Sequence, residues 1–215
     1  MLTVYGYRPS SNVQVVMWGI GELGLPFSFV ERGHAFGGLD TPEFRARNPH
    51  GLVPVLEDGD LVVWESCAIL RYLAARYGDD AFWPKDPAAR SQVDMWAEWG
   101  KGTLRMDFTG PIFWARVRTP AARRDEAALT AALARFDRDL ATLEAQVGDG
   151  PWVLGEDFTV ADILVGHQLY RYFTIDVPRA DHPGIAAYYA RLCARPAFAE
   201  HVMVSYDSLR DPDAG

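Results

Sequence analysis

Three adjacent polar residues, Ser10, Ser11 and Asn12, lie where a short apolar run gives way to a helical pattern. The first turn of a helix exposes backbone N–H groups without partners and carries a partial positive charge. Hydroxyl and amide side chains at that place can donate hydrogen bonds to an anion. Ser and Asn are also preferred helix caps, so a purely structural role is the alternative.

Two residue pairs later in the first half could also bind a ligand. A proline in Val53-Pro54 cannot donate to a sheet ladder, so it marks an edge or a turn. A cis bond there would leave the Val53 backbone free to pair with a peptide-like ligand, although most X-Pro bonds are trans.

Glu65-Ser66 lies at a predicted strand-to-helix turn, where Glu65 can hold an ammonium group and the helix start can receive a carboxylate. A plain cap is the alternative for Ser66.

The elements that position these residues alternate between strand and helix. Residues 2–5 and 27–30 predict two strands around a helix whose apolar residues recur at steps of three and four, and this βαβ unit favours a parallel pair. Residues 53–56 and 61–64 predict an antiparallel hairpin, because Asp58-Gly59 separates their apolar runs. With a further helix at 66–77, the sequence predicts an α/β domain of βαβ followed by ββα, with a mixed four-stranded sheet.

The second half contains helical patterns and no convincing strand. Two prolines interrupt the periodicity at 80–87, which indicates a linker. A long helix is predicted from about residue 88, with a kink at its glycines 100, 102 and 110. The apolar stripe at 129–147 predicts a second long helix, and shorter ones are predicted at 159–173 and 183–193. Thr159 and Asp162 predict a capping box at the start of the third helix.

Composition excludes several classes of function. The chain has 21 Lys and Arg against 29 Asp and Glu, a net charge of −8, which argues against a nucleic-acid partner. Its first residues lack a signal-peptide pattern, and no apolar run approaches the roughly 20 residues that cross a bilayer. Cys67 and Cys193 form no CxxC pair, and no histidine has metal-ligand spacing. We therefore expect a cytoplasmic protein with no metal and no membrane partner.

Taken in order, these motifs resemble the cytosolic glutathione S-transferase superfamily. The resemblance runs from residue 2 to about residue 199, and three stretches carry most of it: 48–56 (NPHGLVPVL), 65–73 (ESCAILRYL) and 158–162 (FTVAD). It implies a thioredoxin-like, glutathione-binding domain at 1–79, a linker at 80–87, an all-helical bundle at 88–200 that contributes the electrophile pocket, and a tail at 201–215. A redox thioredoxin has CxxC at the start of its first helix, whereas this chain has Ser10 to Val13 there, so the reacting sulfur must come from glutathione.

The resemblance assigns roles to the polar residues of the first domain. Ser10 matches the serine that hydrogen-bonds the glutathione sulfur in serine-type members, Asn12 matches the asparagine of a bacterial S/T-x-N pattern, and Ser11 is the fallback. A tyrosine-type mechanism through Tyr5 or Tyr7 is a lesser alternative.

The same resemblance implies how glutathione would be held along its length. Val53, with Pro54 cis, would pair with its cysteinyl unit, while Glu65 and Ser66 would hold its γ-glutamyl end. Leu52 stands where relatives often have Lys, Arg or Gln, so His50 or Arg47 would have to bind the glycine carboxylate.

The implied function is attack by the glutathione thiolate on a small, largely apolar electrophile. Five residues are candidates for lining the second-substrate pocket: Trp99, Phe108, Phe113, Trp114 and Arg118. Core or interface packing is the alternative for each of them. A homodimer is implied as well. Glutathione-dependent disulfide reduction on the same site, isomerase or dehalogenase activity, and a non-catalytic binding or assembly module that keeps the fold remain alternatives.

Overall fold

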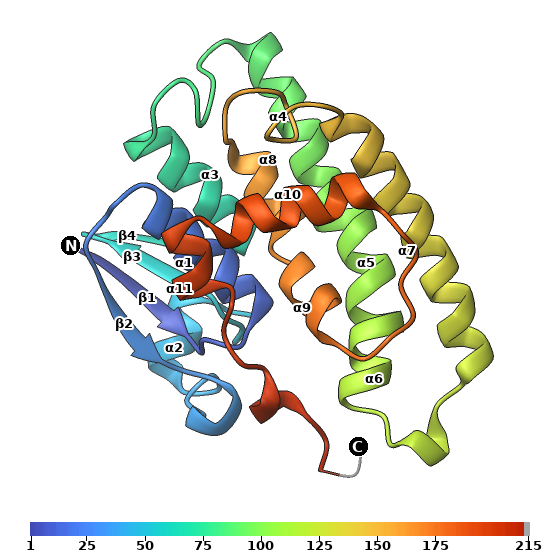
Figure 1. Cartoon of the computed structure of the whole chain (residues 1–215). Coiled ribbons are helices and arrows are strands. Elements are labelled where there is room, and N and C mark those ends of the chain that lie inside the picture. The colour runs from blue at the N-terminus through green and yellow to red at the C-terminus, as the bar shows by residue number, and fades with distance from the viewer. Residues whose placement is uncertain (213–215) are drawn as a thin grey trace.

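A mixed four-stranded sheet organises the first 80 residues. The computed structural model describes residues 1–212, and Figure 1 shows the sheet on one side of the molecule and the helices of the second half on the other. The strands β1 (Leu2–Gly6), β2 (Phe27–Glu31), β3 (Val55–Asp58) and β4 (Leu61–Trp64) lie in the order β2-β1-β3-β4. β1 is parallel to β2 and antiparallel to β3, and β3 is antiparallel to β4. The predicted βαβ-ββα arrangement is confirmed.

Two helices separate the sheet from the second half. They are α1 (Ser11–Glu22) and α3 (Ser66–Tyr77), and both contact α8 (Val160–Gly166) of the helical half. Gly24, with a φ of 62°, follows the end of α1 in the left-handed conformation that glycine adopts most readily. The short helix α2 (Pro42–Arg47), which the sequence analysis did not predict, contacts β4. The starts of α1 and α3 therefore lie at the boundary between the two halves.

The helical half begins with one long helical run containing two π-helical turns. Asp86 caps α4 (Pro87–Trp99), and the π turns η2 (Gly100–Leu104) and η3 (Thr109–Trp114) fall at the predicted glycine kinks. A Cβ on Gly100 would lie 2.9 Å from the Leu164 carbonyl oxygen, so glycine allows α8 to approach closely. The remaining helices are α5 (Arg105–Phe108), α6 (Ala115–Val117), α7 (Glu126–Val147), α9 (Leu169–Thr174), α10 (Pro183–Cys193) and α11 (Pro196–His201).

Several predicted boundaries change in the structure. The third strand begins at Val55, because Val53-Pro54 precedes the sheet. The helix predicted at 159–173 is divided into α8 and α9 by His167 and Gln168. The predicted linker is packed against the protein, since Phe82 and Trp83 are buried in the core.

The tail also packs against the helical half. The Tyr206 ring lies 5.1 Å from the Phe113 ring, and the Asp211 backbone N–H donates to the Val117 carbonyl oxygen. The last three residues of the predicted tail, 213–215, lie outside the described residues.

Candidate active site

The N-terminus of α1 is half-buried and lacks a side-chain cap from any residue that the structure describes. Ser10 occupies the N-cap position, but within residues 1–212 its side chain makes no capping hydrogen bond. Ser11 and Asn12 form the first turn, which contains no acidic residue. The capping role that the sequence left as the alternative therefore does not account for the Ser10 hydroxyl, and both that hydroxyl and the helix dipole remain available to an anion.

A lysine from the helical half joins two of the predicted site residues. The Lys101 ammonium in η2 donates to Asn12 Oδ1 at 2.7 Å and to Ser66 Oγ at 2.8 Å. Ser66 is buried at the start of α3. The predicted sulfur end and the predicted γ-glutamyl end of the site are thus bridged by one cation. Sequence reasoning did not select Lys101, although its place between two glycines of a predicted kink was a signal.

The backbone of Glu65 is strained beside Ser66. Glu65 has φ 69° and ψ 118°, a region that residues with a Cβ rarely adopt, and its side chain is exposed. Strain of this kind persists only where the surroundings impose it, and it is concentrated at ligand sites. Glu65 thus places an exposed carboxylate at the turn between β4 and α3.

The loop before β3 is fixed by Asn48, and it includes the predicted peptide-pairing residues. Asn48 Nδ2 donates to the Leu52 carbonyl oxygen at 2.9 Å, and its Oδ1 accepts from the His50 backbone N–H at 3.0 Å. The Val53-Pro54 bond is cis. The side chain of Leu52 is 59% exposed, and the His50 ring is exposed and lies edge-on to Trp64.

Two alternative residues from the sequence analysis already have other partners. Arg47 Nε donates to Glu57 at 2.6 Å, and Tyr5 donates its hydroxyl to the same carboxylate at 2.7 Å. Burial and this hydrogen bond raise the pKa of Tyr5, opposite to what a thiol-activating tyrosine needs. Tyr7 is half-buried with its ring 5.4 Å from that of His34. His50 is left as the better candidate to bind the glycine carboxylate.

A buried arginine adds positive charge near the start of α1. Arg171 is 2% exposed, and its guanidinium donates to the Pro9 carbonyl oxygen at 2.5 Å and lies over the Phe113 ring. Burial lowers the pKa of Arg171 to about 10. Burial also lowers the pKa of the neighbouring His167 well below its usual value, so that imidazole is neutral.

Comparison with known proteins identifies the family. The N-terminal domain model of glutathione S-transferases matches residues 1–75, and the C-terminal domain model matches 126–191. Glutathione S-transferase GstB of Escherichia coli is 37% identical over 206 residues, covering 95% of this chain and 99% of that protein. The chain belongs to the glutathione S-transferase family. The fold and the transferase class predicted from the sequence are confirmed.

Solved structures and a plant relative agree with this assignment. The theta class glutathione S-transferase from Xanthomonas axonopodis pv. citri, solved with glutathione bound, superposes with a TM-score of 0.87 at 43% identity, covering 95% of this chain and 98% of that one. Glutathione S-transferase 3 of Zea mays is 31% identical over 209 residues, covering 94% and 93% of the two chains.

The structure divides the transferase's five predicted electrophile residues into three groups. Phe108 and Phe113 have no exposed surface and lie in the core, which favours the packing alternative for both. Trp114 is half-buried, and the exposed Arg118 guanidinium lies 3.6 Å from the centre of its ring. Trp99 lines a pocket of about 270 Å³ with three other residues: Met95, Trp96 and Thr142.

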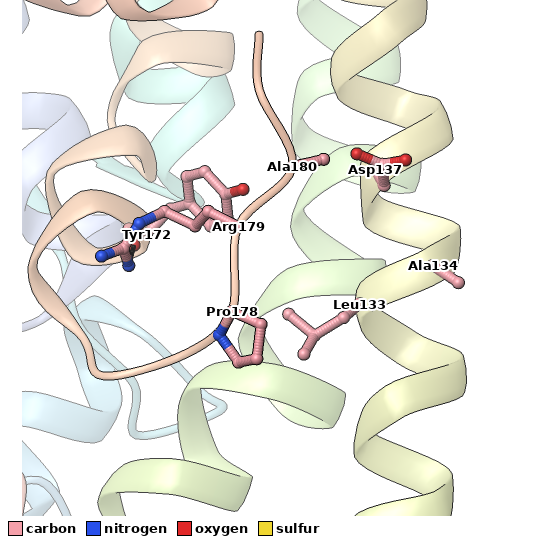
Figure 2. A pocket seen from close by; sticks show the side chains of 7 residues that line it. All are labelled: Leu133, Ala134, Asp137, Tyr172, Pro178, Arg179 and Ala180. Atoms are coloured by element: carbon pink, nitrogen blue, oxygen red, sulfur yellow. Dashed lines mark hydrogen bonds between the residues drawn. The ribbon is translucent and has the colours of Figure 1, made fainter.

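A pocket within the helical half lies apart from all of these residues. It has a volume of about 270 Å³ and is bounded by α7, by Tyr172 of α9 and by the segment after α9 (Figure 2). None of the residues that the sequence predicted for the transferase's site lines it. Across residues 1–212 we find no group of three metal-binding side chains and no helix able to span a membrane.

Proposed function

We propose that this chain conjugates glutathione to a small electrophile, with the glutathione thiolate at the N-terminus of α1. The observation that carries the proposal is the uncapped helix start, where the Ser10 hydroxyl lacks a capping partner. Membership of the family and the similarity to a glutathione-bound structure support the same site. No observation favours disulfide reduction or a non-catalytic role.

The free energies involved are sufficient for a serine-type mechanism. Lowering the pKa of a thiol by about 2 units requires roughly 2.7 kcal/mol. A hydrogen bond to a charged acceptor contributes about 1.5–3 kcal/mol, and a helix terminus adds about 0.5–1 kcal/mol. Donors from Ser10 and Asn12 together with the α1 dipole reach that total, so the thiolate forms without a separate general base.

We further propose how the rest of glutathione lies. The Val53 backbone pairs with the cysteinyl unit, and Glu65 and Ser66 hold the γ-glutamyl ammonium and carboxylate. His50 binds the glycine carboxylate, because Arg47 is already paired with Glu57.

The electrophile is proposed to lie against the Trp114–Arg118 pair. The Trp114 ring contacts the Phe113 ring, and Phe113 contacts Arg171, which in turn contacts Pro9 beside the start of α1. This chain of contacts supports an electrophile site beside the proposed thiolate. Trp114 supplies an apolar face for an electrophile that is largely apolar.

Assembly, location and biological role are also proposals. Exposed apolar side chains on β4, Leu61 and Val62, and Met95 on α4 support a homodimer, since a partner subunit could cover them. A cytoplasmic role in detoxification follows from the family resemblance. Sedimentation velocity that gives the 24.0 kDa mass of one chain would contradict the dimer.

The mechanism is tested by titrating the thiolate absorbance of bound glutathione against pH. We expect the thiol pKa in the wild type to lie about 2 units below the ordinary value of about 8.5. Ser10→Ala should raise it by about 1–2 units and lower kcat/KM at neutral pH about 10- to 100-fold. Ser11→Ala shows which hydroxyl acts, and Ser91→Ala on the surface of α4 is the matched control. A bound thiol with an unshifted pKa in the wild type would refute the mechanism.

A further inference from the structure

Lys101 crosses from the helical half to the glutathione domain. It lies in the π turn η2, where Gly100 packs closely against α8, and its ammonium contacts Asn12 and Ser66. Asn12 lies in the first turn of α1 and Ser66 is the first residue of α3, the helices at either end of the proposed glutathione site. One side chain therefore connects both helix starts.

The Lys101 ammonium has polar hydrogen-bond partners but, among the described residues, no ion-pair partner. Both contacted atoms are neutral oxygens, and within residues 1–212 no carboxylate forms an ion pair with it. Burial lowers the pKa of Lys101 and Arg105 adds to this effect, while the charges of Cys67, Glu65 and Glu98 only partly oppose it. A desolvated cation of this kind is costly unless an anion binds nearby, so the arrangement is suited to an anionic ligand.

The direction of the two hydrogen bonds determines what Asn12 and Ser66 can offer. An ammonium donates hydrogen bonds and cannot accept them. Asn12 must therefore turn its oxygen toward Lys101, which turns its NH₂ group away. Ser66 likewise accepts through its oxygen, so its own hydrogen is free to be donated elsewhere. Without Lys101, the Asn12 amide could rotate and the Ser66 hydroxyl could donate to another acceptor.

We propose that Lys101 is a positioning residue of the glutathione site, which orients the Asn12 NH₂ toward the glutathione sulfur and the Ser66 O–H toward the γ-glutamyl carboxylate. This inference rests on the proposed function and deepens it. The helical half then shapes glutathione binding as well as electrophile binding, and it does so through a single contact from η2.

The test compares Lys101→Met, Lys101→Arg and Lys85→Met. Lys85 is the chain's only other lysine and is exposed near the start of α4, so it is a matched control. For each variant, calorimetry gives the glutathione Kd, absorbance gives the pKa of the bound thiol, and steady-state kinetics give kcat and KM. Thermal unfolding without ligand reports on the fold.

We expect Lys101→Met to weaken glutathione binding about 10- to 100-fold and to raise the pKa of the bound thiol by about 1 unit. Lys101→Arg, which also donates only, should restore part of both properties, and Lys85→Met should match the wild type. The Tm of ligand-free Lys101→Met should equal or exceed that of the wild type, because a half-buried charge without an ion-pair partner is removed.

Two outcomes would overturn the inference about Lys101, and a third would overturn the proposed function instead. If Lys101→Met binds glutathione with an unchanged Kd and thiol pKa, Lys101 does not position the site. If its Tm falls and Lys101→Arg restores only the Tm, its role is structural. If the wild type gives no heat with millimolar glutathione, the proposed function itself fails.

Discussion

Glu65 combines an exposed carboxylate with a backbone conformation that residues bearing a Cβ rarely adopt. Its φ of 69° places strain directly before the first residue of α3. A non-glycine residue in such a region costs about 1–3 kcal/mol. The proposed γ-glutamyl site therefore includes a residue whose backbone conformation lowers stability. Replacing Glu65 should change binding and stability in opposite directions.

Glu65→Gly should stabilise the ligand-free protein and weaken glutathione binding. Glycine removes the strain but increases the entropy of the unfolded chain, so the net gain is about 1 kcal/mol. Binding should weaken because the carboxylate that is proposed to contact the γ-glutamyl ammonium is lost. Urea unfolding and calorimetry measure the two effects. Glu65→Ala is the control, since it lacks the carboxylate and keeps the strain; equal stability of the Gly and Ala variants would contradict the argument.

At the residue scale, local sequence patterns predicted the polar groups of the site but not their connection. Ser10, Asn12 and Ser66 follow from their positions at helix starts, which can be read within a few residues. Lys101 could not be found that way, because its contact with Asn12 joins residues 89 positions apart. The same limit affected Phe108 and Phe113, since an aromatic residue in a helical stripe has the same pattern in a core as in a pocket.

At the scale of elements, α8 depends on a network around one buried carboxylate. Asp162 has no exposed surface, and it accepts hydrogen bonds from the backbone N–H groups of Val153 and Thr159 and from the Tyr188 hydroxyl. The capping box predicted from the sequence is therefore present, and it also ties α8 to the loop after α7 and to α10. Because α8 contacts α1, α3 and α4, this cap supports the elements that hold the site.

Asp162→Asn should destabilise the protein by about 2–4 kcal/mol. Both Asp162 oxygens accept from backbone N–H groups, so an Asn amide must turn its NH₂ toward one of these donors. Urea unfolding measures the loss. Asp157→Asn, at an exposed position in the loop before α8, should change stability by less than about 0.5 kcal/mol. A loss at residue 162 no greater than that at residue 157 would show that the network contributes little.

The start of α10 is joined to α7 through a histidine between two carboxylates. His182 Nε2 lies 2.7 Å from Asp137, and its Nδ1 lies 3.0 Å from Glu144. Burial alone would lower the pKa of His182, but these two carboxylates outweigh it and raise the pKa above its usual value of 6.5. The protonated form is thus favoured by folding, and this contact is sensitive to pH.

The contribution of His182 to stability should decrease with rising pH. Because its pKa is raised by folding, the stabilisation is complete below about pH 6.5 and is lost as the pH rises through the folded value. We expect a contribution on the order of 1 kcal/mol at pH 6. The difference in unfolding free energy between the wild type and His182→Gln, measured from pH 5.5 to 9 (roughly spanning both values of the pKa), should shrink at the alkaline end. The same difference for Thr130→Ala, a substitution at an exposed position of α7 that removes no titratable group, should stay flat. A constant difference for His182→Gln would mean that folding does not shift the pKa of His182.

The helices of the second half were predicted well where the apolar periodicity is continuous, and less well where the helix is interrupted. The stripe at 129–147 corresponds to α7, and the glycines after Trp99 correspond to the π turns. The break between α8 and α9 was missed, because the apolar pattern continues through His167 and Gln168, both fully buried. Burial of polar residues at a helix break depends on tertiary packing, which a local pattern does not contain.

At the scale of the whole molecule, one hydrophobic cluster extends across both halves, while a second lies within the sheet domain. Trp18 of α1 is fully buried and packs against Phe198 and Phe158 of the helical half, with ring centres 4.8 and 5.7 Å away. Figure 1 shows α11 alongside α1 at this boundary, and contacts between the two helices agree. The chain passes from the sheet domain to the helical half at residues 80–87, but side-chain packing continues across this boundary. We therefore expect the two halves to unfold together.

An ion pair reinforces this boundary. The Arg195 guanidinium donates from Nε and Nη2 to the two Glu22 oxygens at 2.8 and 2.5 Å, and Trp18 Nε1 donates to Glu22 Oε1. The Glu22 side chain is 10% exposed, and Arg195 also lies over the Phe158 ring. Removing one charge of such a pair leaves the other desolvated without a partner, which costs more than the pair itself contributes.

Glu22→Gln should therefore lower the urea midpoint while the two halves continue to unfold in a single step. We expect a loss of about 2 kcal/mol, because the amide keeps the shape of Glu22 and loses its charge. Tryptophan fluorescence and far-UV circular dichroism should give coincident transitions in the wild type and in the variant, since the shared core still couples α1 to α8 and α11. The exposed Glu31→Gln at the end of β2 is the charge-matched control. Two separate transitions in the wild type would refute a common core, whereas separation only in Glu22→Gln would mean that the ion pair, and not the packing of Trp18, couples the halves.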